Sequence, residues 1–140
     1  MNPKADSPLD IKIFLQRLQC WAKKRPDVLC LLLVGSYATQ TARPDSDVDL
    51  LIVTHDPQMY LTTPNWISVF GQVDRCHKEL YGWVTSLRVW YEEGLEVEYG
   101  ITDKRWIQLP LDEGTQRVLR GGVMVLLDRT EKLRDILQDL

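Results

Sequence analysis

The chain has 140 residues, of which 44% are hydrophobic and 26% are charged, and its formal net charge is −3. This length and composition are typical of one globular domain with a single core, so we expect residues 1–140 to form one domain. Proteins that bind a long nucleic acid usually carry a surplus of positive charge, and the acidic balance here disfavours that partner.

Neither a leader nor a membrane segment is visible in the sequence. The N-terminal stretch MNPKADSPLD lacks the apolar core of a signal peptide, and the run VLCLLLV is too short to span a bilayer. We therefore expect a cytoplasmic protein with no membrane partner. The three cysteines lie far apart and match neither a disulfide framework nor a zinc site. Cys20 and Cys30 fall in apolar patterns, which predicts that both are core residues.

The first predicted element is an amphipathic helix over residues 7–25. Ser7 can cap this helix, Pro8 suits its first helical position, and Pro26 ends it. Its apolar residues recur at helical spacing, which places them on one face. They are Ile11, Phe14, Leu15, Leu18, Trp21 and Ala22.

Two strands follow, at residues 28–34 and 47–53. Both read as apolar runs without alternation, which indicates that each strand is covered on both faces. Residues 55–66 contain two prolines and several polar residues and are predicted to form a loop. The stretch NWISVFG, residues 65–71, is predicted to be a short helix.

A β-hairpin is predicted over residues 84–101, VTSLRVWYEEGLEVEYGI. With a three-residue loop at 92–94 and Gly94 in a left-handed conformation, the facing pairs become apolar or aromatic. These pairs are Tyr91 with Leu95, Val89 with Val97, and Leu87 with Tyr99. The opposite side then carries Ser86, Arg88, Trp90, Glu96 and Glu98. This clean separation of the two sides favours that register.

The last part of the chain predicts three short elements. Residues 111–122 form a short helix or turn, residues 123–128 a strand, and residues 130–140 a helix. The apolar face of that last helix consists of Leu133, Ile136, Leu137 and Leu140. These elements predict a small α/β (α+β) domain in which helices flank a mixed β-sheet.

Candidate site residues lie at the ends of the two early strands. Gly35 and Ser36 end the first strand, and Asp47 and Asp49 open the second. Period-two geometry places the two carboxylates on one face, about 7 Å apart. Ionised carboxylates beside an apolar strand are costly unless water or a cation compensates them. Oxygen ligands with this spacing suit Mg²⁺, and Gly35 allows a phosphate to approach the backbone closely.

The stretch GSYATQTARPDSDVDLLIV resembles the Gly-Ser-x10-Asp-x-Asp signature of the polymerase-β-like nucleotidyltransferase superfamily, especially its minimal (MNT-type) members. The resemblance implies the palm fold of that superfamily and transfer of a nucleoside monophosphate, usually AMP from ATP, to an acceptor. In that family Gly35 and Ser36 would hold the phosphates. Asp47 and Asp49 would bind two Mg²⁺ ions, and a third carboxylate on a neighbouring strand would complete the site.

The hairpin offers two candidates for the third carboxylate, Glu98 and Glu96. We prefer Glu98, in the sequence VEYG, as a metal ligand that also accepts the proton of the acceptor hydroxyl. Arg88 lies on the same side of the hairpin and could either neutralise a phosphate or pair with Glu96.

One departure from the resemblance concerns the loop after Ser36. Relatives often have Arg-Gly where this chain has Thr39 and Gln40. Loss of that glycine would tighten the phosphate loop, and loss of the arginine removes a cationic contact. This departure favours the alternative function, a non-catalytic module that keeps the fold and binds a nucleotide or a partner.

The acceptor is left open by the sequence. Larger relatives add a helical domain for the acceptor, and we expect a chain of this length to take that surface from a helical partner protein or a second copy of itself. The acceptor would be a hydroxyl of a small molecule or of a partner protein. In the second case the chain would resemble an antitoxin that modifies its cognate toxin.

Overall fold

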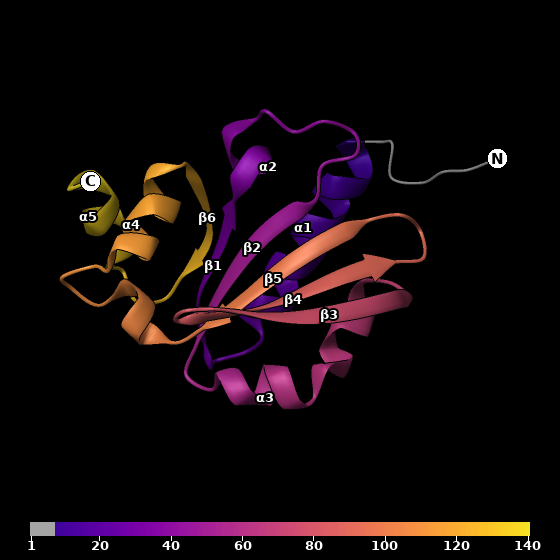
Figure 1. Ribbon diagram of the computed structural model, residues 1–140, viewed down its shortest axis with the longest axis horizontal. Coiled ribbons are helices and arrows are strands. Elements are labelled where there is room, and N and C mark those ends of the chain that lie inside the picture. The colour runs from indigo at the N-terminus through magenta and orange to yellow at the C-terminus, as the bar shows by residue number, and fades with distance from the viewer. Residues whose placement is uncertain (1–7) are drawn as a thin grey trace.

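Six strands form one mixed sheet in the computed structural model, which describes residues 8–140 (Figure 1). The strands lie in the order β3-β4-β5-β2-β1-β6, and only β2 and β5 pair in parallel. Their bounds are β1 Val28–Val34, β2 Val48–Thr54, β3 Val73–Tyr81, β4 Val84–Tyr91, β5 Glu96–Thr102 and β6 Val123–Asp128. The predicted α/β (α+β) class with a mixed sheet is confirmed.

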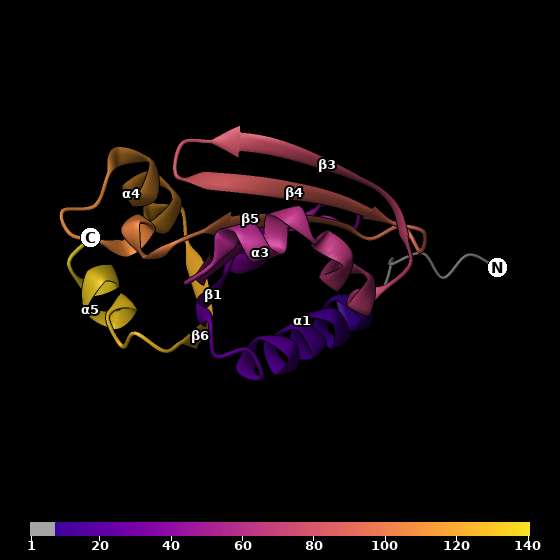
Figure 2. The ribbon, with the colours of Figure 1, turned by 90° about the horizontal axis from the view of Figure 1, so that it is seen from below.

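Helices lie on both faces of this sheet. They are α1 Pro8–Lys23, α2 Gly35–Thr39, α3 Pro57–Thr62, α4 Glu113–Arg120 and α5 Leu133–Gln138, with 3-10 helices η1 Pro64–Phe70 and η2 Lys104–Ile107. In Figure 1, α1 lies behind the sheet, whereas α4 and α5 lie together beside β1 and β6; Figure 2 shows the same separation from below. No helix within residues 8–140 combines the length and the apolar character that crossing a bilayer requires.

The larger core fills the space between the sheet and the layer formed by α1, α3 and η1. Alternate residues of the central strands point into it, among them Leu50 and Ile52 of β2 and Val97 and Tyr99 of β5. Trp66 of η1 contributes an aromatic ring that meets Tyr99 edge-on, with the ring centroids 4.9 Å apart. This face of the sheet is therefore closed by apolar and aromatic packing.

A smaller core lies on the other face, between β1 and β2 and the layer formed by η2, α4 and α5. Leu51 and Val53 of β2 pack there against Trp106, Leu119 and Leu133. Both β1 and β2 contribute to both cores, which explains why their sequences are apolar without alternation. The predicted cover on both faces is confirmed.

Most predicted elements of the first half are present. The structure has α1 from Pro8 to Lys23. Within this helix Ile11, Phe14, Leu18 and Ala22 are buried and Leu15 and Trp21 pack at the edge of the core, as the sequence predicts. The cap predicted at Ser7 lies outside the described residues. Cys30 is buried, but Cys20 is exposed, so its assignment to the core was wrong.

The hairpin is also confirmed. Leu87 pairs with Tyr99 and Val89 with Val97, and the Tyr91 amide donates to the Leu95 carbonyl at 2.9 Å. Gly94 has a φ of 100°, the left-handed conformation that the three-residue loop needs.

Three predictions fail locally. Residues 55–66 are not a loop, because Asp56 caps α3 through its side chain and Pro57 begins it. No element was predicted at β3, whose polar residues are exposed because it is an edge strand. The last helix is shorter than predicted and begins at Leu133, and Leu140 lies beyond it with 38% of its surface exposed.

Candidate active site

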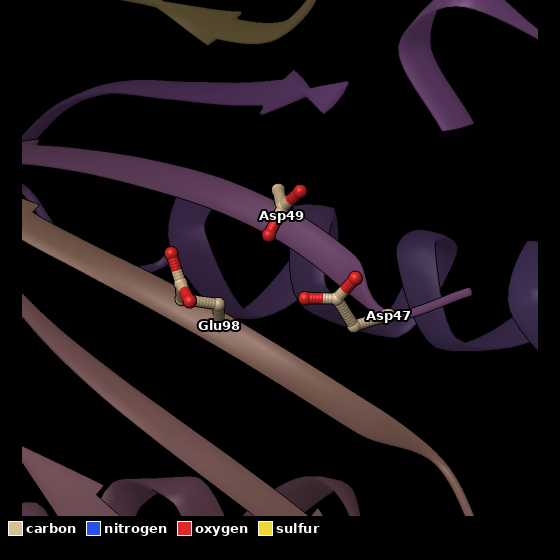
Figure 3. A group of neighbouring side chains, drawn as sticks. All are labelled: Asp47, Asp49 and Glu98. Carbon is tan, nitrogen blue, oxygen red and sulfur yellow. The ribbon is translucent and has the colours of Figure 1, made fainter. Parts of the chain in front are cut away.

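Three carboxylates meet at the start of β2. Asp47 immediately precedes this strand, Asp49 lies on it, and Glu98 lies directly opposite Asp49 on the parallel strand β5. One oxygen from each side chain lies within 4.8 Å of the others. Figure 3 shows the three groups converging on the space between the two strands. The structure therefore brings Glu98, rather than Glu96, to the two aspartates.

Strand alternation explains why these carboxylates avoid the larger core. Leu50 and Ile52 fill that core, so Asp49 between Val48 and Leu50 points to the opposite face. On β5, Val97 and Tyr99 likewise enter the larger core and leave Glu98 on the face of Asp49. Parallel pairing in register then places the two carboxylates side by side.

Asp49 is the carboxylate most affected by its surroundings. Burial, followed by the negative charges of Asp47 and Glu98, raises its pKa from 3.8 to about 7, although Arg88 opposes this rise. The arrangement thus disfavours a third negative charge at this point. A divalent cation between the three groups would remove that penalty, and hard oxygen donors are the ligands that Mg²⁺ prefers.

Gly35 lies against Asp49 at the end of β1. It has a φ of 73°, and a Cβ atom at this position would collide with Oδ2 of Asp49. Any other residue would therefore move the carboxylate or the backbone. Ser36 follows Gly35 in α2. It lies near the carboxylates because Val34, at the end of β1, pairs with Asp49 of β2.

The loop after Ser36 has a left-handed residue, a conformation that favours glycine, but the residue at that position is Gln40. Gln40 ends α2 with φ 62° and ψ 32°, in the left-handed region, and its amide donates to the Ser36 carbonyl. The Thr41 amide also donates to the Ser36 carbonyl, at 2.9 Å. Gln40 is therefore a residue with a Cβ in a conformation that costs free energy.

Arg88 of β4 also reaches the cluster. Its Nη2 donates to Oε1 of Glu98 at 2.5 Å and lies 4.0 Å from Oδ2 of Asp47, and its Nη1 is 3.7 Å from Glu96. The sequence left two roles open for Arg88, and the structure gives its shortest contact to Glu98 rather than to Glu96. The hydrogen bond to the neighbouring carboxylate of Glu98 raises the pKa of the Arg88 guanidinium above its usual value.

A cleft of about 850 Å³ extends from the carboxylates along the same face of the sheet. Its floor includes Ser86 and Gly100, and its far wall is α4. Trp83, in the β3–β4 turn, stands at its side and is 49% exposed. Clefts of this volume with mixed apolar and polar lining are typical of sites for small organic molecules.

Apart from Gly35, Asp49 and Glu98, the residues that line the cleft were not predicted as site residues from the sequence. Ser86 and Thr115 are polar side chains that are 3% and 1% exposed, and the Thr115 hydroxyl has no hydrogen-bond partner among the described residues. Only the polar side of the hairpin pattern gave a signal, and it applied to Ser86. Nothing in the local sequence of α4 indicates that Thr115 faces β5 across a cleft.

Comparison with protein families gives this geometry its context. The family described as nucleotidyltransferase domain matches residues 15–113, most of the chain. The chain belongs to this nucleotidyltransferase family. The matched region contains β1, β2 and β5 with the three carboxylates, whereas β6 and α5 lie beyond it. No curated protein matches the chain.

A solved structure shows the same fold at low sequence identity. An aminoglycoside 6-adenyltransferase from Bacillus subtilis has a TM-score of 0.51 and 15% identity, and the match covers 74% of this chain and 36% of that one. The Cid1 poly(U) polymerase has a TM-score of 0.47 and 15% identity over 66% of this chain and 29% of that one. GLD-2, in its complex with RNP-8, has a TM-score of 0.49 and 20% identity over 71% and 34%. The chain thus spans about a third of the length of these proteins.

Proposed function

We propose that the chain is a single nucleotidyltransferase domain that transfers a nucleoside monophosphate from a nucleoside triphosphate to a hydroxyl group. ATP is the first donor to test. The observation that carries the proposal is the convergence of Asp47, Asp49 and Glu98 within 4.8 Å, in a chain that belongs to the nucleotidyltransferase family. A triphosphate donor also agrees with the cytoplasmic location expected from the sequence.

The donor set fits divalent cations, and Mg²⁺ is the ion we propose, with two ions bound. Asp47, Asp49 and Glu98 offer only carboxylate oxygens, and a cation would offset the unfavourable environment that raises the pKa of Asp49. When bound, Mg²⁺ supplies Lewis-acid stabilisation of the charge that develops on the α-phosphate and on the leaving pyrophosphate.

The remaining roles follow from position. Gly35 and Ser36 would hold the phosphates, because they follow β1 beside Asp49 and Gly35 has no Cβ between its backbone and that carboxylate. The hydroxyl oxygen of the acceptor would attack the α-phosphorus, and Glu98 would accept the proton of that hydroxyl. The bond from the α-phosphorus to pyrophosphate would break in the same step. Positioning of donor and acceptor would supply most of the remaining rate enhancement.

The cleft supports a small-molecule acceptor. It adjoins Asp49 and Glu98, and its volume of about 850 Å³ lies within the range of small-molecule sites.

The alternative acceptor is a hydroxyl of a partner protein, as in an antitoxin that modifies a helical toxin. A neighbouring gene for a small helical ribonuclease-like protein would favour that case, and a second copy of this chain could supply the acceptor surface instead.

The direct test uses α-³²P-labelled ATP, CTP, GTP and UTP with Mg²⁺ and a cell lysate, followed by separation of labelled products by size. We expect label from one triphosphate to appear in an acceptor and pyrophosphate to be released. The variant Asp47→Asn with Asp49→Asn should lose activity by a factor on the order of 10³ or more. Asp74→Asn removes an exposed carboxylate from β3 and is the matched control. Release of pyrophosphate at equal rates by the wild type and by the Asp47→Asn, Asp49→Asn variant would contradict the proposal.

A second candidate is a non-catalytic module that binds a nucleotide or a partner. The bond from Arg88 to Glu98 favours it, because this pair already balances one carboxylate of the cluster. Thermal unfolding with Mg²⁺ and ATP, combined with the labelling assay, separates the two candidates. Stabilisation by both ligands without any transfer of label would identify the module, whereas stabilisation with transfer identifies the enzyme.

A further inference from the structure

Arg88 is the cationic side chain that the fold places among the carboxylates. It faces Glu98 across the β4–β5 pair, donates to it at 2.5 Å and lies 4.0 Å from Asp47. A guanidinium this close to two ligands of a proposed cation site opposes the entry of a second positive charge by Coulomb repulsion. It also bonds Oε1, one of the two Glu98 oxygens that could bind a cation.

The present arrangement leaves one donor of Arg88 without a partner. Its Nε lies buried, with no hydrogen-bond acceptor among residues 8–140. A buried donor without an acceptor costs free energy, so bonding to Glu98 alone does not satisfy the guanidinium. Phosphate oxygens bind a guanidinium through two parallel hydrogen bonds, which makes a polyphosphate a better partner than one carboxylate oxygen.

We propose that Arg88 couples the binding of the divalent cation to the binding of the nucleoside triphosphate. This inference rests on the function proposed above. Without a nucleotide, Arg88 holds Glu98 and weakens the affinity of the cluster for a cation. When the triphosphate binds, the guanidinium moves to its phosphate oxygens and releases Glu98. Arg88 thus acts on the cation through Glu98 and on the donor by direct contact with its phosphates, and it makes the cation bind tightly only together with the donor.

The test measures Mn²⁺ affinity, by electron paramagnetic resonance of free Mn²⁺, with and without α,β-methylene-ATP. For the wild type we expect weak binding that the analogue strengthens. Arg88→Gln should bind Mn²⁺ roughly tenfold more tightly than the wild type when no nucleotide is present, the factor expected for loss of one charged hydrogen bond. The analogue should then strengthen Mn²⁺ binding by this variant much less than it does in the wild type.

Two further variants separate coupling from loss of charge or of structure. Arg105 forms an exposed ion pair with Asp103, in which Nη2 and Oδ2 lie 2.7 Å apart. Arg105→Gln removes the same charge from this pair and should leave Mn²⁺ affinity unchanged. Arg88→Lys keeps the charge but not the planar fork. It should therefore bind Mn²⁺ as weakly as the wild type when alone and respond less to the analogue.

Each other outcome overturns the inference. If Arg88→Gln binds Mn²⁺ no better than the wild type, or only lowers the melting temperature, Arg88 has a purely structural role. If the wild type and Arg88→Gln differ as expected in Mn²⁺ affinity but neither binds the analogue, Arg88 does repel the cation. The coupling and the function proposed above would then both fail. If neither binds Mn²⁺ at all, both proposals fail through the cation site itself.

Discussion

The two faces of the sheet use alternate residues of the same strands for opposite purposes. On one face, Leu50 of β2, Leu87 of β4 and Tyr99 of β5 pack into the larger core beneath α1, α3 and η1. On the other face, the neighbouring residues Asp49 and Glu98 line a cleft of about 850 Å³ with α4 as its far wall. A shift of one residue in the strand register would exchange these two faces.

This contrast shows how the fold tolerates a cluster of acids next to its core. The packed face supplies the apolar burial that stabilises the sheet. That burial offsets the unfavourable electrostatics on the cleft face, where the pKa of Asp49 is raised to about 7. The larger core and the carboxylate cluster thereby lie on opposite faces of the sheet, and substitutions on the two sides of β4 should behave differently.

The largest expected difference compares two neighbours on β4. Leu87 and Ser86 are 2% and 3% exposed, but Leu87 lies in the larger core and Ser86 lines the cleft. Leu87→Ala should lower the free energy of unfolding by about 2–5 kcal/mol, because it leaves a cavity. Ser86→Ala should lower it by about 1 kcal/mol or less. Urea unfolding of both variants measures the difference, and equal losses would mean that the two faces are not separated as described.

A second difference concerns the pH dependence of stability. The pKa of Asp49 is about 7 in the folded chain and has its usual value of 3.8 after unfolding. Between these values the folded chain keeps a proton that the unfolded chain loses, so stability should fall as pH rises from about 4 to 7 and level off above that. Asp49→Asn carries no charge and should not show this fall.

Urea unfolding at a series of pH values, with and without Mg²⁺, tests this expectation. The stability of Asp49→Asn relative to the wild type should increase from pH 4 to pH 7, and Mg²⁺ should flatten the wild-type curve. Leu87→Ala, on the packed face, is the control and should run parallel to the wild type. A wild-type curve that rises over this range would show that the carboxylate is stabilised in its charged form.

The smallest expected effect lies in the loop next to the cleft face. Gln40 adopts a left-handed conformation with φ 62°, so Gln40→Gly should raise the free energy of unfolding by about 0.5–1 kcal/mol. Glu131 has a φ of 61° and lies far along the chain, after β6, which makes Glu131→Gly the matched control for stability. Thermal unfolding measures both. Destabilisation by Gln40→Gly would mean that its side chain makes contacts that outweigh the backbone strain.

Local sequence patterns were sufficient for the elements that depend on short-range chemistry. The apolar run of β2 with Asp47 and Asp49 at its start, Gly35 at the end of β1, and the hairpin around Gly94 all appear where the sequence predicts them. The failures have local causes too. The sequence predicts a loop at Asp56 and Pro57, which in fact cap and begin α3, and β3 has the polar composition of an edge strand.

The sequence by itself determined which side chains share a face of a strand, because side chains alternate with a period of two wherever a strand forms. Only the tertiary structure decided that β5 lies parallel to β2, which sets Glu98 beside Asp49, and that Arg88 bonds Glu98 rather than Glu96. It also decided that α4 closes the far side of the cleft. These pairings join residues far apart in the chain, and the burial of two whole sheet faces selects them rather than any pattern near the residues themselves.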